Sequence, residues 1–347
     1  MRVLVTGSHG YIGSVLTPIF GLAGHDVLGL DTRYYRGCDF GPELGEFDSV
    51  GRDVRDVTPS ELEGFDAIVH LAALSNDPLG DFDRRLTEQI NFAASVRLAT
   101  AAREAGVRRF VFASSCSMYG ASGSDDTLDE KAPLRPLTAY AESKVRAEEE
   151  LMGLAGPDFV PVSMRNATVY GASPRLRLDI VLNNLAAWSL TTGRIRLLSD
   201  GTAWRPLIHV RDVAKAALAL LEVPEEVVRG TAINIGSNEQ NYLIRDLAGM
   251  LSETTGCEVD IAEGSVADQR SYRVDFSLLG RLLPDLTLDW NAELGARELV
   301  DSMSQVGLTA AEFDSDRYVR LRRLKTLLER GDIDGELRWQ TPAESGA

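Results

Sequence analysis

Tyr140 and Lys144 are the residues whose types and spacing most directly suggest chemistry. Four positions apart, they would share one face of a helix. A fixed ammonium group there would stabilise a tyrosinate and lower the tyrosine pKa from its ordinary value of roughly 10. Ser115 lies in a hydroxyl-rich segment about 25 residues upstream and would donate a hydrogen bond to a reacting oxygen. A Tyr-x-x-x-Lys pair also occurs by chance on surface helices, but the serine segment favours a base that removes a hydroxyl proton.

Three glycines near the start of the chain predict a phosphate-binding loop. Gly7, Gly10 and Gly13 follow an apolar strand at 3–5 and open a helix expected over 12–21. Glycines there permit a tight turn and let backbone N–H groups approach a pyrophosphate at the positive end of the helix. Their spacing is Gly-x-x-Gly-x-x-Gly, so the position between strand and helix carries the prediction.

Asp31 ends the next apolar run, 27–31, and indicates which dinucleotide would bind. A carboxylate at this strand end accepts the ribose hydroxyls of NAD and repels the 2′-phosphate of NADP. Arg33, two residues later, leaves some tolerance of NADP open. We therefore favour NAD.

The elements that must position these residues alternate between strands and helices. Such alternation predicts an α/β fold, a Rossmann-type doubly wound parallel sheet with a smaller C-terminal substrate-binding region. We expect an NAD-binding domain over 1–170 that also receives strands from later residues, a substrate-binding region over 171–313, and a helical extension over 314–347. In that extension, leucines at helical spacing alternate with arginines, which predicts an amphipathic closing helix with a solvated basic face. The expected strands are 3–5, 27–31, 65–71, 110–113, 160–164, 232–235 and 259–261, with a long helix around 86–105.

Composition excludes several classes of protein. With 36 Lys and Arg against 52 Asp and Glu, the net charge of −16 argues against non-specific nucleic-acid binding. The 3 cysteines form no CxxC pair, so neither a disulfide framework nor a metal site is indicated. No apolar run reaches membrane-spanning length, and Met1-Arg2 leads directly into a strand rather than a signal peptide. We expect a cytoplasmic protein without a membrane partner.

Further segments give the chain a family resemblance. They run in family order over roughly residues 1–290: Asp53-Val54, His70 to Ala73, Asn91, Ser114 to Gly120, and Asp200-Gly201-Thr202 through Asp212. Together with the motifs above, they resemble the extended short-chain dehydrogenase/reductase superfamily, in its NAD-dependent nucleotide-sugar epimerase/dehydratase family (UDP-glucose 4-epimerase-like). The resemblance implies NAD as cofactor and a nucleotide-diphosphate sugar as substrate.

The resemblance also implies site residues. Ser115, Tyr140 and Lys144 would be catalytic. Substrate contacts would come from Ser115, Thr168, Asn183, Arg205 and either Arg270 or Arg273, while Trp188 and Arg177 lie in the same variable segment as Asn183. Cofactor contacts would come from Gly7, Gly10, Tyr11, Ile12, Gly13, Asp31, Asp53, Val54, Leu71, Ala72, Ala73, Ser75, Asn91, Tyr140, Lys144 and Ala167.

Departures from the family pattern bear on the reaction. The 4,6-dehydratases carry an Asp-Glu pair where this chain has Cys116 and Ser117, and neither is a suitable general acid. The 3,5-epimerases place a cysteine one position later, so Cys116 is either a third acid/base or a small buried packing residue, and we favour packing. What remains is oxidation and reduction at sugar C4. We expect a 4-epimerase, with a 4-ketoreductase using NAD(P)H as the main alternative and a 4,6-dehydratase or a 3,5-epimerase as the less favoured ones.

Three further expectations concern the sugar pocket, the oligomeric state and whether the protein is catalytically active. Thr168, Pro206 and Leu207 stand where the family commonly has an asparagine, an aspartate and an aromatic residue, so the sugar pocket is expected to be atypical. The helices around 86–105 and 140–154 are expected to form a homodimer. A catalytically silent nucleotide-binding regulator of this fold would lack Tyr140 or Lys144, and both are present.

Overall fold

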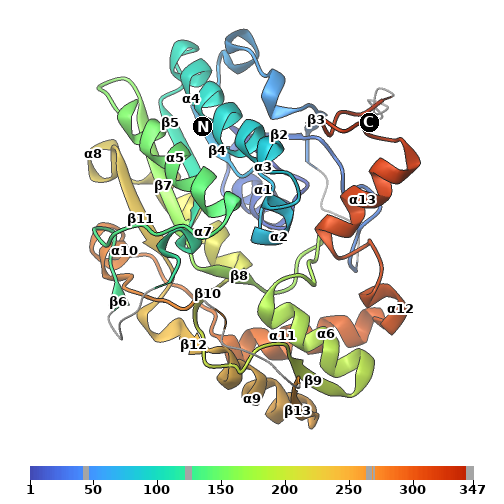
Figure 1. The fold of residues 1–347 in the computed structure, drawn as a ribbon. Helices are drawn as coiled ribbons and strands as arrows, with labels where there is room; N and C mark the ends of the chain where they lie inside the picture. Colours follow the sequence, from blue (N-terminus) through green and yellow to red (C-terminus); the bar gives the residue numbers. More distant parts are fainter. Residues whose placement is uncertain (42–46, 122–126, 263–267, 269, 341–347) are drawn as a thin grey trace.

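A seven-stranded parallel sheet forms the centre of the structure, a computed structural model that describes residues 1–41, 47–121, 127–262, 268 and 270–340 (Figure 1). The strand order reverses between β1 and β4, and doubly wound sheets bind ligands at such a point, outside the carboxyl ends of the strands. From one edge to the other the strands are β11 (Thr231–Ile235), β7 (Val160–Asn166), β5 (Arg109–Ser115), β4 (Ala67–His70), β1 (Arg2–Thr6), β2 (Asp26–Asp31) and β3 (Ser49–Gly51).

Helices cover both faces of this sheet. Val3 and Val5 pack in the core shared with α1 (Gly13–Leu22) and α7 (Val210–Glu222). Leu4 points the other way, into the core shared with the helices α4 (Ala94–Glu104) and α5 (Ala139–Gly153). Successive strand residues face opposite sides, and both sides are buried here, so the strands must be apolar throughout.

A smaller lobe lies below the sheet in the view of Figure 1. Three helices of this lobe, within the described residues, pack around one apolar core that includes Leu185, Leu247 and Leu299. The helices are α6 (Val181–Thr192), α9 (Ile244–Thr255) and α11 (Ala292–Val306). Two small sheets accompany them: β9 (Arg194–Leu197) pairs with β13 (Glu258–Ile261), and β10 (Trp204–His209) lies between β8 (Thr168–Tyr170) and β12 (Asn241–Leu243).

The helix expected around 86–105 is composite. It begins as α3 (Arg84–Thr87), continues through a π-helical turn, η3 (Glu88–Ala93), and ends as α4. Asn91 lies in the π-helical turn, a local form often found at functional sites. The remaining short elements are η1 (Val54–Asp56), η2 (Pro59–Leu62), α2 (Asp77–Gly80), η4 (Cys116–Tyr119), α8 (Glu225–Val228), η5 (Asn238–Gln240), α10 (Ser277–Leu282), α12 (Ala310–Phe313), and β6 (Thr127–Leu128) paired with β14 (Arg273–Val274).

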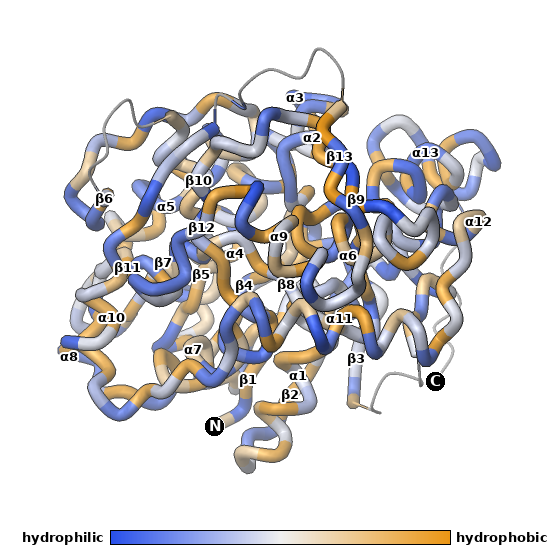
Figure 2. The backbone as a smooth tube through the Cα atoms, turned by 90° about the horizontal axis from the view of Figure 1, so that it is seen from below, coloured by the Kyte–Doolittle hydropathy of each residue, from blue (hydrophilic) through white to orange (hydrophobic). Residues whose placement is uncertain are grey.

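The end of the chain packs back onto the large sheet's helices and loops. Its helix α13 (Arg320–Arg330) alternates polar and apolar residues, visible along the tube in Figure 2. The expected solvated basic face is only partly present: Arg322 and Lys325 are exposed, but Arg320 is buried, and Arg323 donates to the main-chain oxygen of Tyr34. The leucines dock in an apolar cluster that also holds Leu79 and Leu86. Residues 341–347 of the expected extension lie outside the described part.

The expected strands are present, and two of them clarify the organisation. Residues 232–235 return to the large sheet as part of β11, whereas 259–261 belong to β13 in the smaller lobe. Within the described residues, no helix is both long and apolar enough to span a bilayer. The same residues contain no cluster of three His, Cys, Asp or Glu side chains arranged to hold a metal ion.

Candidate active site

A cavity of about 810 Å³ lies between the large sheet and the smaller lobe. Its walls include the carboxyl ends of β2, β4 and β5, so it extends across the point where the strand order reverses. The structure brings most of the expected site residues to this one space: Gly7, Gly10, Tyr11, Ile12, Gly13, Asp31, Asp53, Val54, Leu71, Ala72, Ala73, Ser75, Ser115, Tyr140, Lys144, Ala167, Thr168, Arg205 and Arg270.

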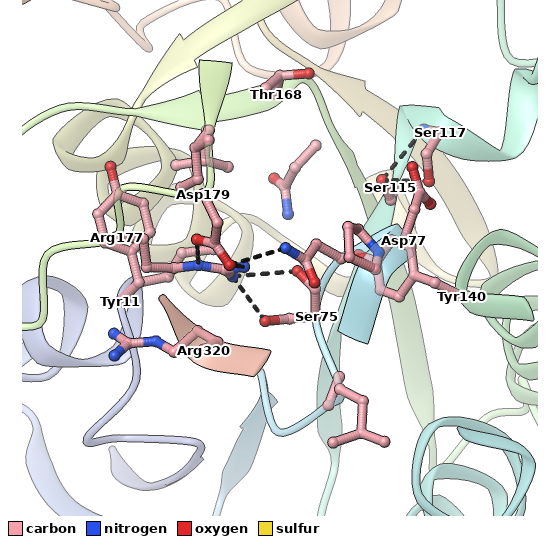
Figure 3. Close-up of a pocket in the computed structure, with 18 of the residues that line it drawn as sticks. Tyr11, Ser75, Asp77, Ser115, Ser117, Tyr140, Thr168, Arg177, Asp179 and Arg320 are labelled. Carbon is pink, nitrogen blue, oxygen red and sulfur yellow. Dashed lines mark hydrogen bonds and ion pairs between the residues drawn. The ribbon is translucent and has the colours of Figure 1, made fainter. Parts of the chain in front are cut away.

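The end of β5 and the first turns of α5 position the expected catalytic residues. Thr138 caps α5 by accepting a hydrogen bond from the backbone N–H of Ala141 at 3.2 Å, which sets the helix start just before Tyr140. Lys144 Nζ donates to the main-chain oxygen of Ala113 at 2.7 Å and lies 5.9 Å from the Tyr140 ring centroid. Ser115 is the last residue of β5 and lies beside Tyr140 (Figure 3).

The electrostatics of this group differ from the expectation. Burial raises the pKa of Tyr140 to about 12, although a hydrogen bond with Ser115 acts in the opposite direction. Burial also lowers the pKa of Lys144 to about 7, opposed by the charge of Glu148. The expected lowering of the Tyr140 pKa is therefore not found in the protein alone, because burial has the largest effect on this phenol. Forming a tyrosinate requires further positive charge in the cavity.

The glycine loop has the close contacts that a dinucleotide site needs. Gly7 has φ +75°, and a Cβ on it would lie 2.8 Å from the backbone nitrogen of Ala72, two residues after β4. A Cβ on Gly13 would lie 2.2 Å from the carbonyl oxygen of Gly7. Only glycine fits at either position, and the resulting loop leaves the amino end of α1 open to the cavity.

Asp31 and Arg33 are arranged in a way that favours NAD over NADP. The Asp31 carboxylate accepts hydrogen bonds from the backbone N–H groups of His9 at 3.0 Å and Arg33 at 2.6 Å. The guanidinium of Arg33 turns away to Ser49, donating to its main-chain oxygen at 3.1 Å and its hydroxyl at 2.9 Å. The Arg33 guanidinium is therefore held by Ser49, whereas tolerance of NADP would need it free to bind the 2′-phosphate.

The structure distinguishes between the two candidates for a second diphosphate arginine. Arg205 and Arg270 both line the cavity, and both bind the carboxylate of Asp268, at 2.8 Å and 3.0 Å. Arg273 instead packs 4.8 Å above the Trp204 ring. Arg270 is therefore the one placed beside Arg205.

Two of the expected contact residues lie behind the cavity wall. Asn91 is buried and holds both main-chain polar groups of Leu74. Asn183 is buried on α6 and its amide binds Gly171, Arg177 and the Tyr11 hydroxyl. Its neighbour Asn184 lines the cavity instead, because consecutive residues of a helix point about 100° apart. Trp188 lies elsewhere, with its ring against Phe313.

The sequence did not indicate Asn166 and Arg320 as cavity residues, and it gave Arg177 no role. Arg177 donates to both carboxylate oxygens of Asp179 and to the hydroxyl of Ser75 at 2.8 Å (Figure 3). Asn166 has a buried Oδ1 for which the described residues supply no hydrogen-bond partner. Arg320 reaches the cavity from the C-terminal extension. Only the Arg177-x-Asp179 spacing could have been noticed in the sequence, because the other two depend on long-range packing.

Cys116 is turned away from the cavity. Its side chain is fully buried, and its thiol donates to the main-chain oxygen of Arg165 at 3.0 Å. Burial raises the pKa of this thiol well above its usual value. A thiol in this state is a packing group rather than an acid or base.

Comparisons with known proteins agree with this site. The family profile described as the NAD dependent epimerase/dehydratase family matches residues 3–236, more than half of the chain. The chain belongs to this family. The UDP-glucose 4-epimerase of Mycolicibacterium smegmatis is 32% identical over 289 residues, which is 79% of this chain and 90% of that protein.

Two solved structures resemble the whole architecture. MoeE5 in complex with UDP-glucuronic acid and NAD matches with a TM-score of 0.76 and 27% identity, over 88% of this chain and 99% of that one. TunA, an NAD-dependent NDP-hexosamine 5,6-dehydratase of tunicamycin biosynthesis, matches with a TM-score of 0.77 and 25% identity, over 88% and 98% of the two chains.

NAD is therefore the cofactor, and this chain's residues fit it. The glycine cradle suits the diphosphate, Asp31 suits the adenosine ribose, and the unpartnered oxygen of Asn166 suits an amide N–H of the nicotinamide.

Proposed function

We propose that this enzyme is a nucleotide-sugar 4-epimerase. The observation that carries the proposal is the state of the acidic groups around Tyr140: Asp77, Asp179 and Asp268 are each paired with an arginine. A sugar held against Tyr140 and Ser115 would meet hydroxyl groups, while the carboxylates of Asp77, Asp179 and Asp268 are engaged by arginines in the protein alone. Chemistry at a hydroxyl-bearing carbon is therefore favoured over removal of a proton from carbon.

Each step has a residue suited to it. Tyr140 Oη takes the proton of the sugar 4-hydroxyl, and Ser115 orients both oxygens. NAD, held by the glycine loop and Asp31, would supply the reversible hydride chemistry at C4 that passes through a 4-keto sugar. Lys144 adds positive charge beside the phenolate that forms. Arg205 and Arg270 hold the nucleotide diphosphate while the sugar turns between the two hydride transfers.

Water elimination needs an additional acid and base. Cys116, at a position where the dehydratases carry an acidic residue, is buried away from the cavity, and its neighbour Ser117 accepts a hydrogen bond from Ser115 at 2.9 Å. The similarity to TunA, a dehydratase, shows that the fold alone does not choose between epimerisation and water elimination. The side chains at positions 116 and 117 carry the distinction. A UDP-sugar is the first substrate to test, because MoeE5 binds UDP-glucuronic acid.

Mass spectrometry in heavy water tests the reaction. The purified enzyme is incubated with UDP-, GDP-, TDP- and CDP-sugars without added cofactor, and Tyr140→Phe serves as the control. We expect a product of unchanged mass, without deuterium and with altered retention. Loss of water with deuterium uptake would make the protein a dehydratase, and deuterium uptake alone would indicate epimerisation next to a ketone. Turnover only of a 4-keto sugar with NAD(P)H would make it a reductase.

We also propose a homodimer formed through the face made by η3, α4 and α5. That face carries a half-open groove of about 570 Å³ with the apolar side chains of Val57, Phe92 and Val96. Within that face, α5 packs against both η3 and α4, so two copies of the face would form a four-helix contact. A monomeric mass by light scattering would contradict this proposal.

A further inference from the structure

We propose that the C-terminal extension is part of the cofactor site: Arg320 is the counter-ion of the NAD diphosphate, and the turn at 334–339 shapes the adenosine end. The family profile ends at residue 236, so this role belongs to a part of the chain that does not define the family. The proposal depends on NAD binding and not on which sugar reaction follows.

Arg320 is a buried cation at the wall of the cavity. It is the first residue of α13, its exposed fraction is 2%, and it lines the same space as Gly10 and Tyr11. Its guanidinium lies 4.1 Å from the centroid of the Tyr35 ring and donates to the main-chain oxygen of Arg175 at 2.6 Å. Figure 3 shows Arg320 on the same side of the cavity as Tyr11 and Arg177.

The negative charge near Arg320 compensates it only in part: the charge of Asp179 favours the protonated guanidinium, but Asp179 is itself paired with Arg177. The neighbouring arginines Arg175 and Arg177 form ion pairs with Asp39 and Asp179. Within the described part of the chain, no carboxylate lies at ion-pair distance from Arg320. Burial accordingly lowers the pKa of this guanidinium to about 10, and the nearby charge of Arg177 adds to that effect. A buried cation without a counter-ion is costly, so this site is built for an anion that the protein does not provide.

The position of Arg320 along the cavity indicates which anion. Asp31 and Asp53 lie at the β2 side, where the adenosine is expected, and Tyr140 lies beyond β5, where the nicotinamide is expected. The glycine loop after β1 lies between them. The part of NAD that lies between its two nucleosides is the diphosphate, which carries two negative charges. Arg320 and the amino end of α1 therefore contribute positive potential to the same stretch of the cavity.

The turn that ends the extension is tied to the adenosine side of the cavity. Trp339 Nε1 donates to the main-chain oxygen of Thr32 at 2.7 Å, and the Tyr34 hydroxyl donates to that of Leu337 at 2.5 Å. Arg338 forms an ion pair with Asp53 at 3.0 Å. The extension thus fixes the residues that directly follow Asp31 and the carboxylate of Asp53, so the adenosine site is complete only when the extension is docked.

A series of cofactor fragments tests the role of Arg320. Calorimetry on cofactor-free protein compares adenosine, ADP-ribose and NAD binding to the wild type, Arg320→Met and the matched control Arg322→Met, an exposed arginine of the same helix. We expect Arg320→Met to bind ADP-ribose and NAD roughly 10- to 100-fold more weakly, as for loss of one charged hydrogen-bond pair, with adenosine affinity unchanged. Equal loss for all three ligands, or no loss, would overturn the proposal. Should Arg320→Met fail to fold, Arg320→Lys provides the test, with a smaller loss still confined to the diphosphate ligands.

The turn is tested separately through Trp339→Ala. We expect it to weaken adenosine and NAD by the same factor and to speed NAD release measured by stopped-flow fluorescence, because it loosens the adenosine end and leaves Arg320 in place. Adenosine affinity equal to the wild type would refute the role of the turn.

Discussion

The guanidinium of Arg205 donates to the carboxylate of Asp268 at 2.8 Å, inside the cavity. Arg270 binds the same carboxylate through its Nε at 3.1 Å and its Nη2 at 3.0 Å. Although burial opposes it, the hydrogen bonds from Arg270 and the charge of Arg205 hold the pKa of Asp268 below its usual value. In the protein alone, an internal carboxylate therefore occupies the two arginines that a nucleotide diphosphate would need.

We expect Asp268→Asn to strengthen nucleotide binding. Removing the negative charge frees Arg205, leaves Arg270 held only by Asp77, and removes the repulsion that an incoming diphosphate would meet. Isothermal titration with UDP should show an affinity several-fold higher than that of the wild type, with the exposed Asp285→Asn as the control. Weaker UDP binding would mean that Asp268 orients the arginines rather than competing for them.

Tyr140→Phe should separate chemistry from binding. Loss of the phenolic oxygen removes the proposed base, so turnover should fall by about 10²- to 10⁴-fold. The ring still fills its buried position, so NAD and UDP affinities should stay within about twofold of the wild type. A variant that keeps its turnover would place the base elsewhere.

The sequence predicted those parts of the fold and site that depend on short-range patterns. Strands buried on both faces are continuous apolar runs, and the glycine loop and the Tyr140–Lys144 pair each lie within a few residues. The features that the sequence did not reveal depend on long-range packing. Arg320 meets Arg175 only because the extension folds back, and the raised pKa of Tyr140 comes from burial. Asn183 was selected one position away from Asn184, the residue that faces the cavity.

Cys116→Ala provides a test of the 3,5-epimerase alternative. The thiol is buried and bound to a main-chain oxygen, so its removal should cost some stability, about 1 kcal/mol, and leave turnover within about threefold of the wild type. Turnover is measured together with deuterium incorporation at carbons next to C4. Loss of deuterium uptake in the variant would show that the thiol exchanges a carbon-bound proton.

Asn183→Ala should destabilise the protein rather than weaken substrate binding selectively. The amide joins the Tyr11 hydroxyl to the backbone around Gly171, and its loss leaves buried polar groups without partners, at a cost of about 1–3 kcal/mol. Chemical denaturation should show this loss, while UDP affinity in the folded variant stays near that of the wild type. A large selective loss of UDP affinity would restore the expected substrate contact.

The buried ammonium of Lys144 should make the stability of the cofactor-free protein rise with pH just above neutrality. Its pKa is about 7 in the folded state and returns to an ordinary value of roughly 10.4 on unfolding, so between these values the unfolded state binds one more proton. The free energy of unfolding should therefore rise from pH 7 to about pH 8.5, at up to about 1.4 kcal/mol per pH unit. Nearer pH 9 and above, Cys116 and Tyr140 reverse the trend, because burial raises the pKa of each and they ionise first in the unfolded state.

Lys144→Met should remove the rise, and urea unfolding of both proteins at pH 7 and 8.5 measures it. Equal slopes in the two proteins would mean that Lys144 stays protonated when buried.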